Sequence, residues 1–253
     1  MENKVKYKFE LVKDVIDSSI LSCSDLIGDV YYTHSNPANI ESVEIIKIDK
    51  HIRKVRNHKS YELKPHRIIV KQSCDSNIVI SDELGMETVM SNKKVCDEIS
   101  ENINTSFIES LNNNCVVDTI KYFDRGFISN LFSKRDPEQI ISKLVNCNWV
   151  IISNKIFDEL SKSDKLKTSI SEKFTIPIKG LSLCGRIEHI SIYISDQIKD
   201  NEMYIGKLDS ITAVFNKNAE VDTFKCGNFY EEGLKITLEY LFKNNGINKI
   251  ILE

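Results

Sequence analysis

The chain has 253 residues, of which 41% are hydrophobic and 28% charged, and its formal net charge is −3. This composition is typical of a folded domain and argues against a disordered chain and against a general nucleic-acid binder, which is usually basic. No apolar run approaches the roughly 18 residues that span a membrane, and the charged start MENKVKYKFELVKDV is not typical of a signal peptide.

The first 48 residues predict one helix followed by two short strands. Phe9, Val12, Ile16 and Ile20 share one face of an amphipathic helix that ends near Gly28. Residues 30–33 and 43–48 are β-prone runs, and an Asn-Pro step at 36–37 separates them.

Residues 47–71 are strongly basic, with nine cations against two acids. Because the flanks 45–48 and 67–71 look like two strands, we interpret the stretch as an extended hairpin with a basic tip. A solvated charged loop is the ordinary alternative. A nucleic-acid patch is another, although only Tyr61 is present for base stacking. Three histidines lie in the same span, but their spacing does not indicate a metal site.

From about residue 92 the sequence predicts one long helix, which ends at the asparagines 112–114. Its apolar face repeats every four residues, at Val95, Ile99, Ile103, Phe107 and Leu111. The opposite face carries acidic residues, namely Asp97, Glu98, Glu101 and Glu109.

The second half predicts two further helices and many strands. An Asp-Pro step at 136–137 begins a helix, residues 149–152 form a buried strand, and Ser153 caps a helix over 155–160. Residues 186–195 alternate as one half-buried strand. Strands over 203–207, 211–215, 233–242 and 247–252 follow, the last two separated by a turn at 244–246. This order predicts the α+β class.

Chemistry-bearing motifs are absent from the sequence. It has no phosphate-binding loop, nucleophile elbow, kinase signature or zinc-protease signature. The seven cysteines are widely spaced and form no CxxC pair, which predicts reduced thiols in a cytoplasmic setting. We therefore expect no catalytic residue, no cofactor and no metal. An enzyme whose site is assembled from distant residues remains an alternative.

Several segments, in this order, resemble the major capsid (head) proteins of tailed phages with the Hong Kong phage-type fold, most closely those of contractile-tailed phages. Residues 29–46 resemble the strand–Pro–turn–strand segment that leads into the family's extended loop. ELKPHRIIVKQ followed by the acidic SDELGME resembles the return strand that leads into the spine helix. NWVIISNKIFDEL resembles the family's strand-then-helix, and Gly185-Arg186-Ile187 with residues 203–207 resembles its Gly-Arg-Ile and Val-Gly-Tyr-Lys-Gly series. The resemblance covers about residues 29–215. Lys207-Leu208 departs from the family's aromatic-Lys-Gly ending.

The resemblance implies a four-part Hong Kong phage-type organisation. It predicts an N-terminal arm over 1–28 and an extended-loop hairpin over 29–71. A peripheral domain with the spine helix spans 72–114 and 216–253, and an axial domain spans 115–215. The chain would be a non-enzymatic subunit of an icosahedral viral head, assembling with itself into hexamers and pentamers around packaged DNA. Scaffold, portal and decoration proteins are possible partners, DNA contact would be weak and non-specific, and no membrane is involved. An encapsulin-like nanocompartment shell, a vertex paralogue, and an unrelated enzyme or DNA-handling protein remain alternatives.

Charge complementarity within the chain predicts an intersubunit interface. In the family that the chain resembles, the extended loop lies across the neighbouring subunit near its spine helix. The hairpin cations are Lys50, Arg53, Lys54, Arg56 and Lys59, and the acids expected to face them across the subunit boundary are Glu83, Glu87, Asp97, Glu98 and Glu101.

Overall fold

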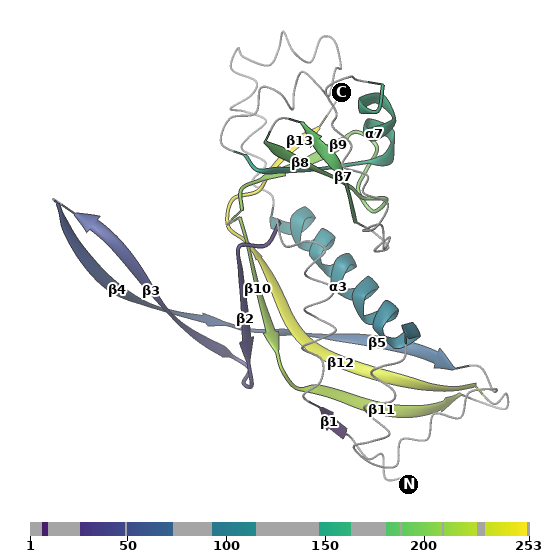
Figure 1. Ribbon diagram of the computed structural model, residues 1–253. Helices are drawn as coiled ribbons and strands as arrows, with labels where there is room; N and C mark the ends of the chain where they lie inside the picture. Colours follow the sequence, from purple (N-terminus) through teal and green to yellow (C-terminus); the bar gives the residue numbers. More distant parts are fainter. Residues whose placement is uncertain are drawn as a thin grey trace. The chain divides into compact units, whose positions relative to one another are not determined.

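The computed structural model describes residues 7–9, 26–48, 50–72, 93–114, 147–162, 181–187, 189–208, 210–226 and 231–251 (Figure 1). The chain divides into two compact units, and each is described by itself. Unit 1 contains residues 1–13, 30–95 and 213–241; unit 2 contains residues 14–29, 96–212 and 242–253. No helix within the described ranges is long and apolar enough to cross a membrane.

Unit 1 is built on a six-stranded sheet whose order is β1-β11-β12-β10-β2, with β5 paired to β12. The bounds are β1 Tyr7–Phe9, β2 Asp29–Thr33, β5 Lys64–Gln72, β10 Ile211–Asn216, β11 Ala219–Cys226 and β12 Glu231–Asn244. Along β12, buried and half-buried residues alternate from Leu234 to Tyr240. Because side chains on a strand point to opposite faces in turn, one face of this sheet is a buried apolar face and the other is open.

A two-stranded ribbon also belongs to unit 1. β3 Ala38–Ile48 and β4 His51–Tyr61 pair antiparallel from Ala38↔Tyr61 to Ile48↔His51, which makes it a hairpin of eleven residue pairs. Lys50, in the turn, has a φ of 67°, the left-handed conformation that tight hairpin turns require. We call residues 38–61 the arm.

Unit 2 has a five-stranded sheet of order β13-β9-β6-β8-β7. Its strands are β6 Trp149–Ile152, β7 Ser182–Ile187, β8 Ile190–Ile194, β9 Glu202–Gly206 and β13 Asn248–Ile251. β6 and β8 are parallel, whereas the other pairs that the register gives are antiparallel. The indole of Trp149 is fully buried and donates a hydrogen bond to the Lys207 carbonyl at 2.9 Å.

Two helices are described, α3 Lys93–Asn114 and α7 Asn154–Leu160. The predicted apolar face of α3 is confirmed, because the five residues that define it are each at most 2% exposed. Within unit 2, the ring of Phe107 packs edge-on against Phe242, with centroids 5.5 Å apart. The predicted cap of α7 is also confirmed, because the Ser153 hydroxyl accepts a hydrogen bond from the Ile156 amide.

The α+β class is confirmed, but three element predictions are wrong. Phe9 lies in a strand and not in a helix, since residues 7–9 pair with β11. The basic hairpin does not join 45–48 to 67–71: β3 pairs with β4, and β5 pairs with β12. Residues 186–195 form two strands with His189 in the turn between them, and β8 is buried on both faces.

The remaining predictions have mixed outcomes. The strands expected over 30–33, 149–152, 203–207, 211–215, 233–242 and 247–252 are all present, and β11 was not predicted. The helix expected from Asp136, the rest of the N-terminal helix, and the residues Glu83 and Glu87 lie outside the described residues. The four-part domain division stays a prediction.

Candidate intersubunit surfaces

The arm is exposed along nearly its whole length. From His51 to Ser60, every residue of β4 is exposed except Asn57, which is half-buried. The predicted interface cations of the arm are all exposed: Lys50, Arg53, Lys54, Arg56 and Lys59. Arg56 makes a loose ion pair with Glu41 at 3.6 Å, and both side chains are more than half exposed. These five cations are therefore accessible, and their place in an intersubunit interface stays a prediction.

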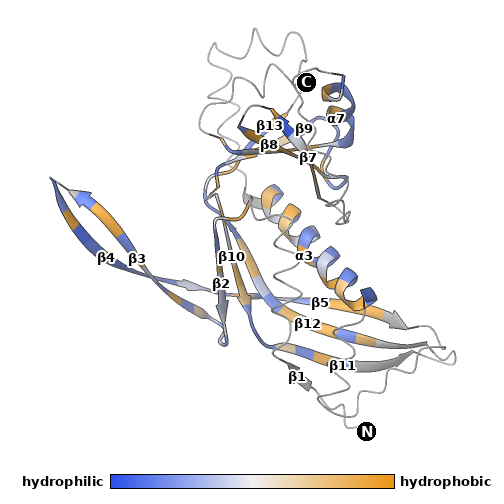
Figure 2. Cartoon of the chain, viewed as in Figure 1, coloured by the Kyte–Doolittle hydropathy of each residue, from blue (hydrophilic) through white to orange (hydrophobic). Residues whose placement is uncertain are grey.

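One face of the arm combines exposed apolar side chains with cations. Directly paired residues on antiparallel strands share a face, so the register places Val43, Ile45 and Lys47 with Arg56, Lys54 and Ile52. We call these six residues the apolar-basic face. Val43, Ile45 and Ile52 are 56%, 66% and 69% exposed, and Figure 2 shows hydrophobic positions along both strands of the arm. Exposed apolar side chains that gather in this way, within a rim of charge, are typical of a protein-binding surface.

The acidic residues of α3 are accessible to different degrees. Asp97 and Glu109 are exposed, whereas Glu98 and Glu101 are half-buried. The predicted contact between these acids and the arm would form between subunits, and it stays a prediction.

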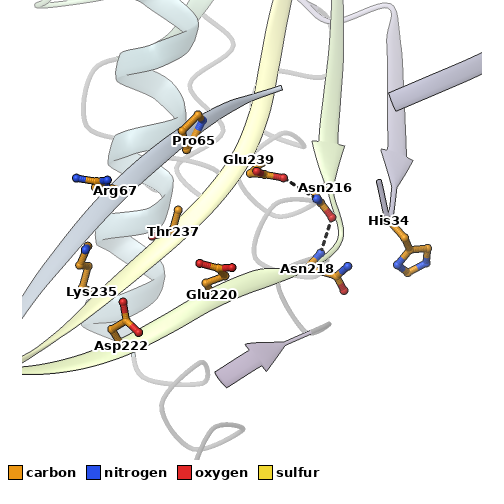
Figure 3. Close-up of a pocket in the computed structure, with 10 residues that line it drawn as sticks. All are labelled: His34, Pro65, Arg67, Asn216, Asn218, Glu220, Asp222, Lys235, Thr237 and Glu239. Carbon is orange, nitrogen blue, oxygen red and sulfur yellow. Dashed lines mark hydrogen bonds between the residues drawn. The ribbon is translucent and has the colours of Figure 1, made fainter. Parts of the chain in front are cut away.

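The open face of the unit 1 sheet carries charged residues in rows across three strands. The register places Asp222, Lys235 and Ile69 in one row, and Glu220, Thr237 and Arg67 in the next. Glu239 follows along β12. A hollow of about 390 Å³ lies over these rows, and Figure 3 shows the side chains that line it.

Hydrogen bonding in this hollow is incomplete. Glu239 accepts hydrogen bonds from the side-chain amides of Asn216 at 2.8 Å and Asn36 at 3.4 Å. Oδ1 of Asp222, by contrast, is shielded from solvent and has no hydrogen-bond partner among the described residues. A shielded carboxylate oxygen without a donor is costly, so this position favours an incoming N–H group.

The sequence analysis did not select this surface, because β11 was not assigned. The sequence of β11, AEVDTFKC, nevertheless shows an alternating pattern. Ala219 and Val221 are buried, whereas the acids Glu220 and Asp222 are half-buried. Half-buried alternation of this kind indicates a strand with one polar face.

The described residues form neither a metal site nor an activated cysteine nucleophile. No group of three or more His, Cys, Asp or Glu side chains there could hold a metal ion. Burial raises the pKa of the Cys96 and Cys147 thiols, and it raises that of Cys184 to about 12. None of these three thiols forms a disulfide, and their raised pKa values keep them protonated at neutral pH, a state in which thiols are poor nucleophiles.

Neither a protein-family model nor a curated protein matches the chain. Solved structures do match it, over most of its length. The putative capsid protein of a prophage of E. coli CFT073 has a TM-score of 0.49 at 6% identity, covering 98% of this chain and 100% of that one. The satellite phage P4 procapsid, described with its size determination (Sid) protein, has a TM-score of 0.49 at 7% identity, with coverages of 95% and 99%. The holo-SrpI encapsulin complex from Synechococcus elongatus PCC 7942 has a TM-score of 0.43 at 9% identity, with coverages of 87% and 84%. Because all three TM-scores lie below 0.5, we base the proposed function on the geometry and sequence of this chain.

Proposed function

We propose that the chain is a structural, non-enzymatic subunit of a closed protein shell and has the Hong Kong phage-type capsid fold. The observation that carries this proposal is the arm. An isolated two-stranded hairpin is marginally stable in water. This one has eleven residue pairs and exposes three large apolar side chains on one face. Such a ribbon is expected to be ordered by contact with another molecule, and a self-assembling subunit supplies that molecule as a further copy of itself.

The finer assignment is a viral head protein that assembles with itself into hexamers and pentamers around DNA. It is supported by the ordered sequence resemblance to phage head proteins over residues 29–215. The net charge of −3 suits this role, because a shell that bound DNA tightly would hinder packaging and release. A nanocompartment shell is the alternative, and the two differ in contents: a head encloses nucleic acid, whereas a nanocompartment encloses protein. The closer resemblance to contractile-tailed phages stays a prediction.

We propose that opposite charges steer the association of subunits. The arm cations would approach the acidic region of a neighbouring subunit, which includes Asp97, Glu98 and Glu101 of α3 together with Glu83 and Glu87. Each exposed pair contributes only about 0–1 kcal/mol, but complementary charges raise association rates and favour one orientation. Assembly should weaken as salt rises, because the Debye length falls from about 10 Å at 0.1 M to about 3 Å at 1 M.

The experiment is sedimentation velocity with negative-stain microscopy of the purified chain, across a series of protein and salt concentrations. We expect capsomers or shells for the wild type. The triple variant Arg53→Glu, Lys54→Glu, Arg56→Glu should remain a folded monomer. The matched control, Lys155→Glu, Lys162→Glu, Lys207→Glu, makes the same charge change at exposed positions of unit 2 and should still assemble.

Two results would overturn this proposal. The first is a wild type that stays monomeric under every condition, including co-expression with its neighbouring genes. The second is a triple arm variant that assembles normally while the wild type binds duplex DNA with a steep salt dependence, which would favour a nucleic-acid function instead.

A further inference from the structure

We propose that the hollow on the open face of the unit 1 sheet binds a small zwitterion, namely a free α-amino acid with a polar side chain. The hollow is lined by charges of both signs. Three of these charges, on Arg67, Lys235 and Asp222, have no partner among the described residues. The site lies within a single subunit, so the proposal does not depend on assembly into a shell.

Two cations on adjacent strands form the end of the site that would hold a carboxylate. Arg67 on β5 is in register with Thr237 on β12, and Lys235 is two residues from Thr237, so the two cations are diagonal neighbours on one face. Figure 3 shows the amino group of Lys235 pointing toward Arg67 and away from Asp222. Like charges in this arrangement repel each other. A carboxylate between them would relieve that repulsion and match the fork of the guanidinium group.

One carboxylate on the third strand forms the end of the site that would hold an ammonium group. Asp222 on β11 is in register with Lys235, yet these two described side chains form no ion pair. Oδ1 of Asp222 is shielded from solvent and has no hydrogen-bond partner among the described residues. The side chain is half-buried, and rotation about its last bond exchanges the two oxygens, because this torsion is broad. An ammonium group there would donate a charge-assisted hydrogen bond.

The short spacing of these charges selects the class of ligand. Directly paired residues on antiparallel strands have Cβ atoms only about 4.5–5.5 Å apart, so the two charged groups of the ligand must lie close together. A free amino acid carries both groups on one carbon atom. A peptide C-terminus lacks the ammonium group, and a nucleotide holds its base far from its phosphate. The volume of about 390 Å³ falls within the range of small-molecule sites, about 300–1,000 Å³.

The rest of the lining favours a polar ligand side chain. Apart from Pro65, the remaining lining residues are polar: His34, Asn216, Asn218, Glu220, Thr237 and Glu239. Glu220 and Glu239 already have partners and are not counted as ligand groups. An apolar ligand side chain would remove some of these polar groups from water without giving them hydrogen bonds, which is unfavourable.

Isothermal titration of the purified chain tests the site with a matched set of probes. L-glutamine carries both charges, N-acetyl-L-glutamine lacks the ammonium group, and the α-amide of L-glutamine lacks the carboxylate. We expect one glutamine to bind per subunit. The other two compounds should bind more weakly by about tenfold or more, the smallest loss expected for a hydrogen bond to a charged group. L-leucine, with an apolar side chain, and O-phosphoethanolamine, whose charges lie further apart, should also bind more weakly than glutamine.

Two substitutions separate the two ends of the site. Asp222→Asn should weaken the binding of glutamine and remove its advantage over the N-acetyl compound. Lys235→Met should remove the advantage of glutamine over the α-amide. The matched controls, Asp158→Asn and Lys162→Met, make the same changes at exposed positions of unit 2 and should bind as the wild type does. Urea unfolding without ligand checks that each variant is folded.

Several outcomes would overturn the site. They are the absence of glutamine binding to the wild type, equal binding of the three glutamine compounds, and stronger binding of L-leucine or O-phosphoethanolamine. A ligand-free Asp222→Asn variant that is less stable than the wild type, without glutamine binding to either, would show that Asp222 and Lys235 pair with each other instead. These results leave the shell function intact, because that function is tested separately by assembly.

Discussion

The ion pair between Glu202 and Lys249 gives the sharpest test of how unit 2 is held together. Nζ of Lys249 lies 2.7 Å from Oε2 of Glu202, and the two side chains are 18% and 5% exposed. Lys199 approaches the other oxygen at 3.4 Å, but its side chain is 79% exposed. The Tyr204 hydroxyl can donate to Glu202 at 3.2 Å or to Oδ1 of Asn112, though it has only one proton for both.

Lys249→Met keeps most of the apolar stem and removes the charge. Breaking a buried ion pair by removing one partner costs about 3–5 kcal/mol, because the other charge stays buried. We expect Lys249→Met to lower the free energy of unfolding by about 3 kcal/mol at pH 7. This is the lower end of that range, because Lys199 and Tyr204 still face the carboxylate of Glu202. Lys199→Met is the matched control: its partner is the same carboxylate, yet its exposure limits the loss to about 0–1 kcal/mol.

The pH dependence of this loss follows from the pKa of Glu202. Burial raises that pKa, but the hydrogen bond and charge of Lys249, with a further contribution from Lys199, hold it below its ordinary value of 4.5. The stabilisation is therefore fully present above pH 4.5 and is lost as the pH falls through the lower folded value. In Lys249→Met, burial still raises the pKa of Glu202, but the hydrogen bond and charge of Lys249 no longer lower it. The folded variant therefore takes up a proton at Glu202 more readily than the wild type does. The difference in stability between wild type and variant should shrink from pH 7 to pH 4.

Urea unfolding followed by fluorescence measures this difference. Trp149 is the single tryptophan, is fully buried, and lies on β6 next to the strand that carries Glu202. With m of about 1–3 kcal/mol per M, the expected loss moves the unfolding midpoint by about 1–3 M. The reasoning would be refuted by an equal loss at pH 7 and pH 4, or by a Lys199→Met variant as unstable as Lys249→Met.

Two further substitutions test the cores of the fold by the same urea assay. Ile99→Ala on α3 should cost about 2–5 kcal/mol because its side chain is fully buried, whereas Glu109→Ala on the exposed side of the same helix should change stability by less than about 0.5 kcal/mol. Gly206→Ala should cost about 1–3 kcal/mol or more, because the new Cβ would lie 2.1 Å from Cζ2 of Trp149. Gly246→Ala meets no atom within 4 Å, so its cost should come from backbone strain alone, about 1–3 kcal/mol at its φ of 136°. Only Gly206→Ala should also change the fluorescence of Trp149 in the folded state, and an unchanged spectrum would contradict the packing argument.

The two described helices, α3 and α7, were predictable because their signals are local. The four-residue apolar repeat of α3 needs no information from elsewhere in the chain, and its buried face agrees with the prediction. The cap at Ser153 depends only on a hydroxyl three residues before an amide, and it too is present.

Strand positions were mostly predictable, but strand partners were not. β3 and β5 were correctly expected to be extended, yet they pair with β4 and β12 and not with each other. β12 is separated from β5 by more than 150 residues, and no local pattern specifies a pairing at that distance. The error over 186–195 has the opposite cause: alternation continues across the turn at His189, so one strand and a tight hairpin look alike in sequence.

The candidate site shows the same limit, because its chemistry depends on register. The arm cations could be listed from the sequence, but only the pairing of β3 with β4 shows that Lys54 and Arg56 share a face with Ile45 and Ile52. The open sheet face needs three strands from distant parts of the chain to bring Asp222 beside Ile69. A shift of one residue in either pairing would exchange the faces and remove both surfaces.

The energetics of the arm contact explain why we propose a closed shell and not an isolated pair of subunits. Complete burial of one Val or Ile side chain is worth about 1.5–3 kcal/mol, and Val43, Ile45 and Ile52 already bury part of their surface. Their total is therefore only a few kcal/mol, whereas bringing two subunits together costs about 4–15 kcal/mol in lost freedom of motion. The gain from a single arm contact is therefore smaller than the cost of association, and one such contact does not hold two subunits together. In a closed ring each subunit makes two such contacts, one through its own arm and one through the surface that receives a neighbour's arm, and the last contact closes without recruiting another subunit. Weak contacts of this kind favour closed assemblies over open fragments.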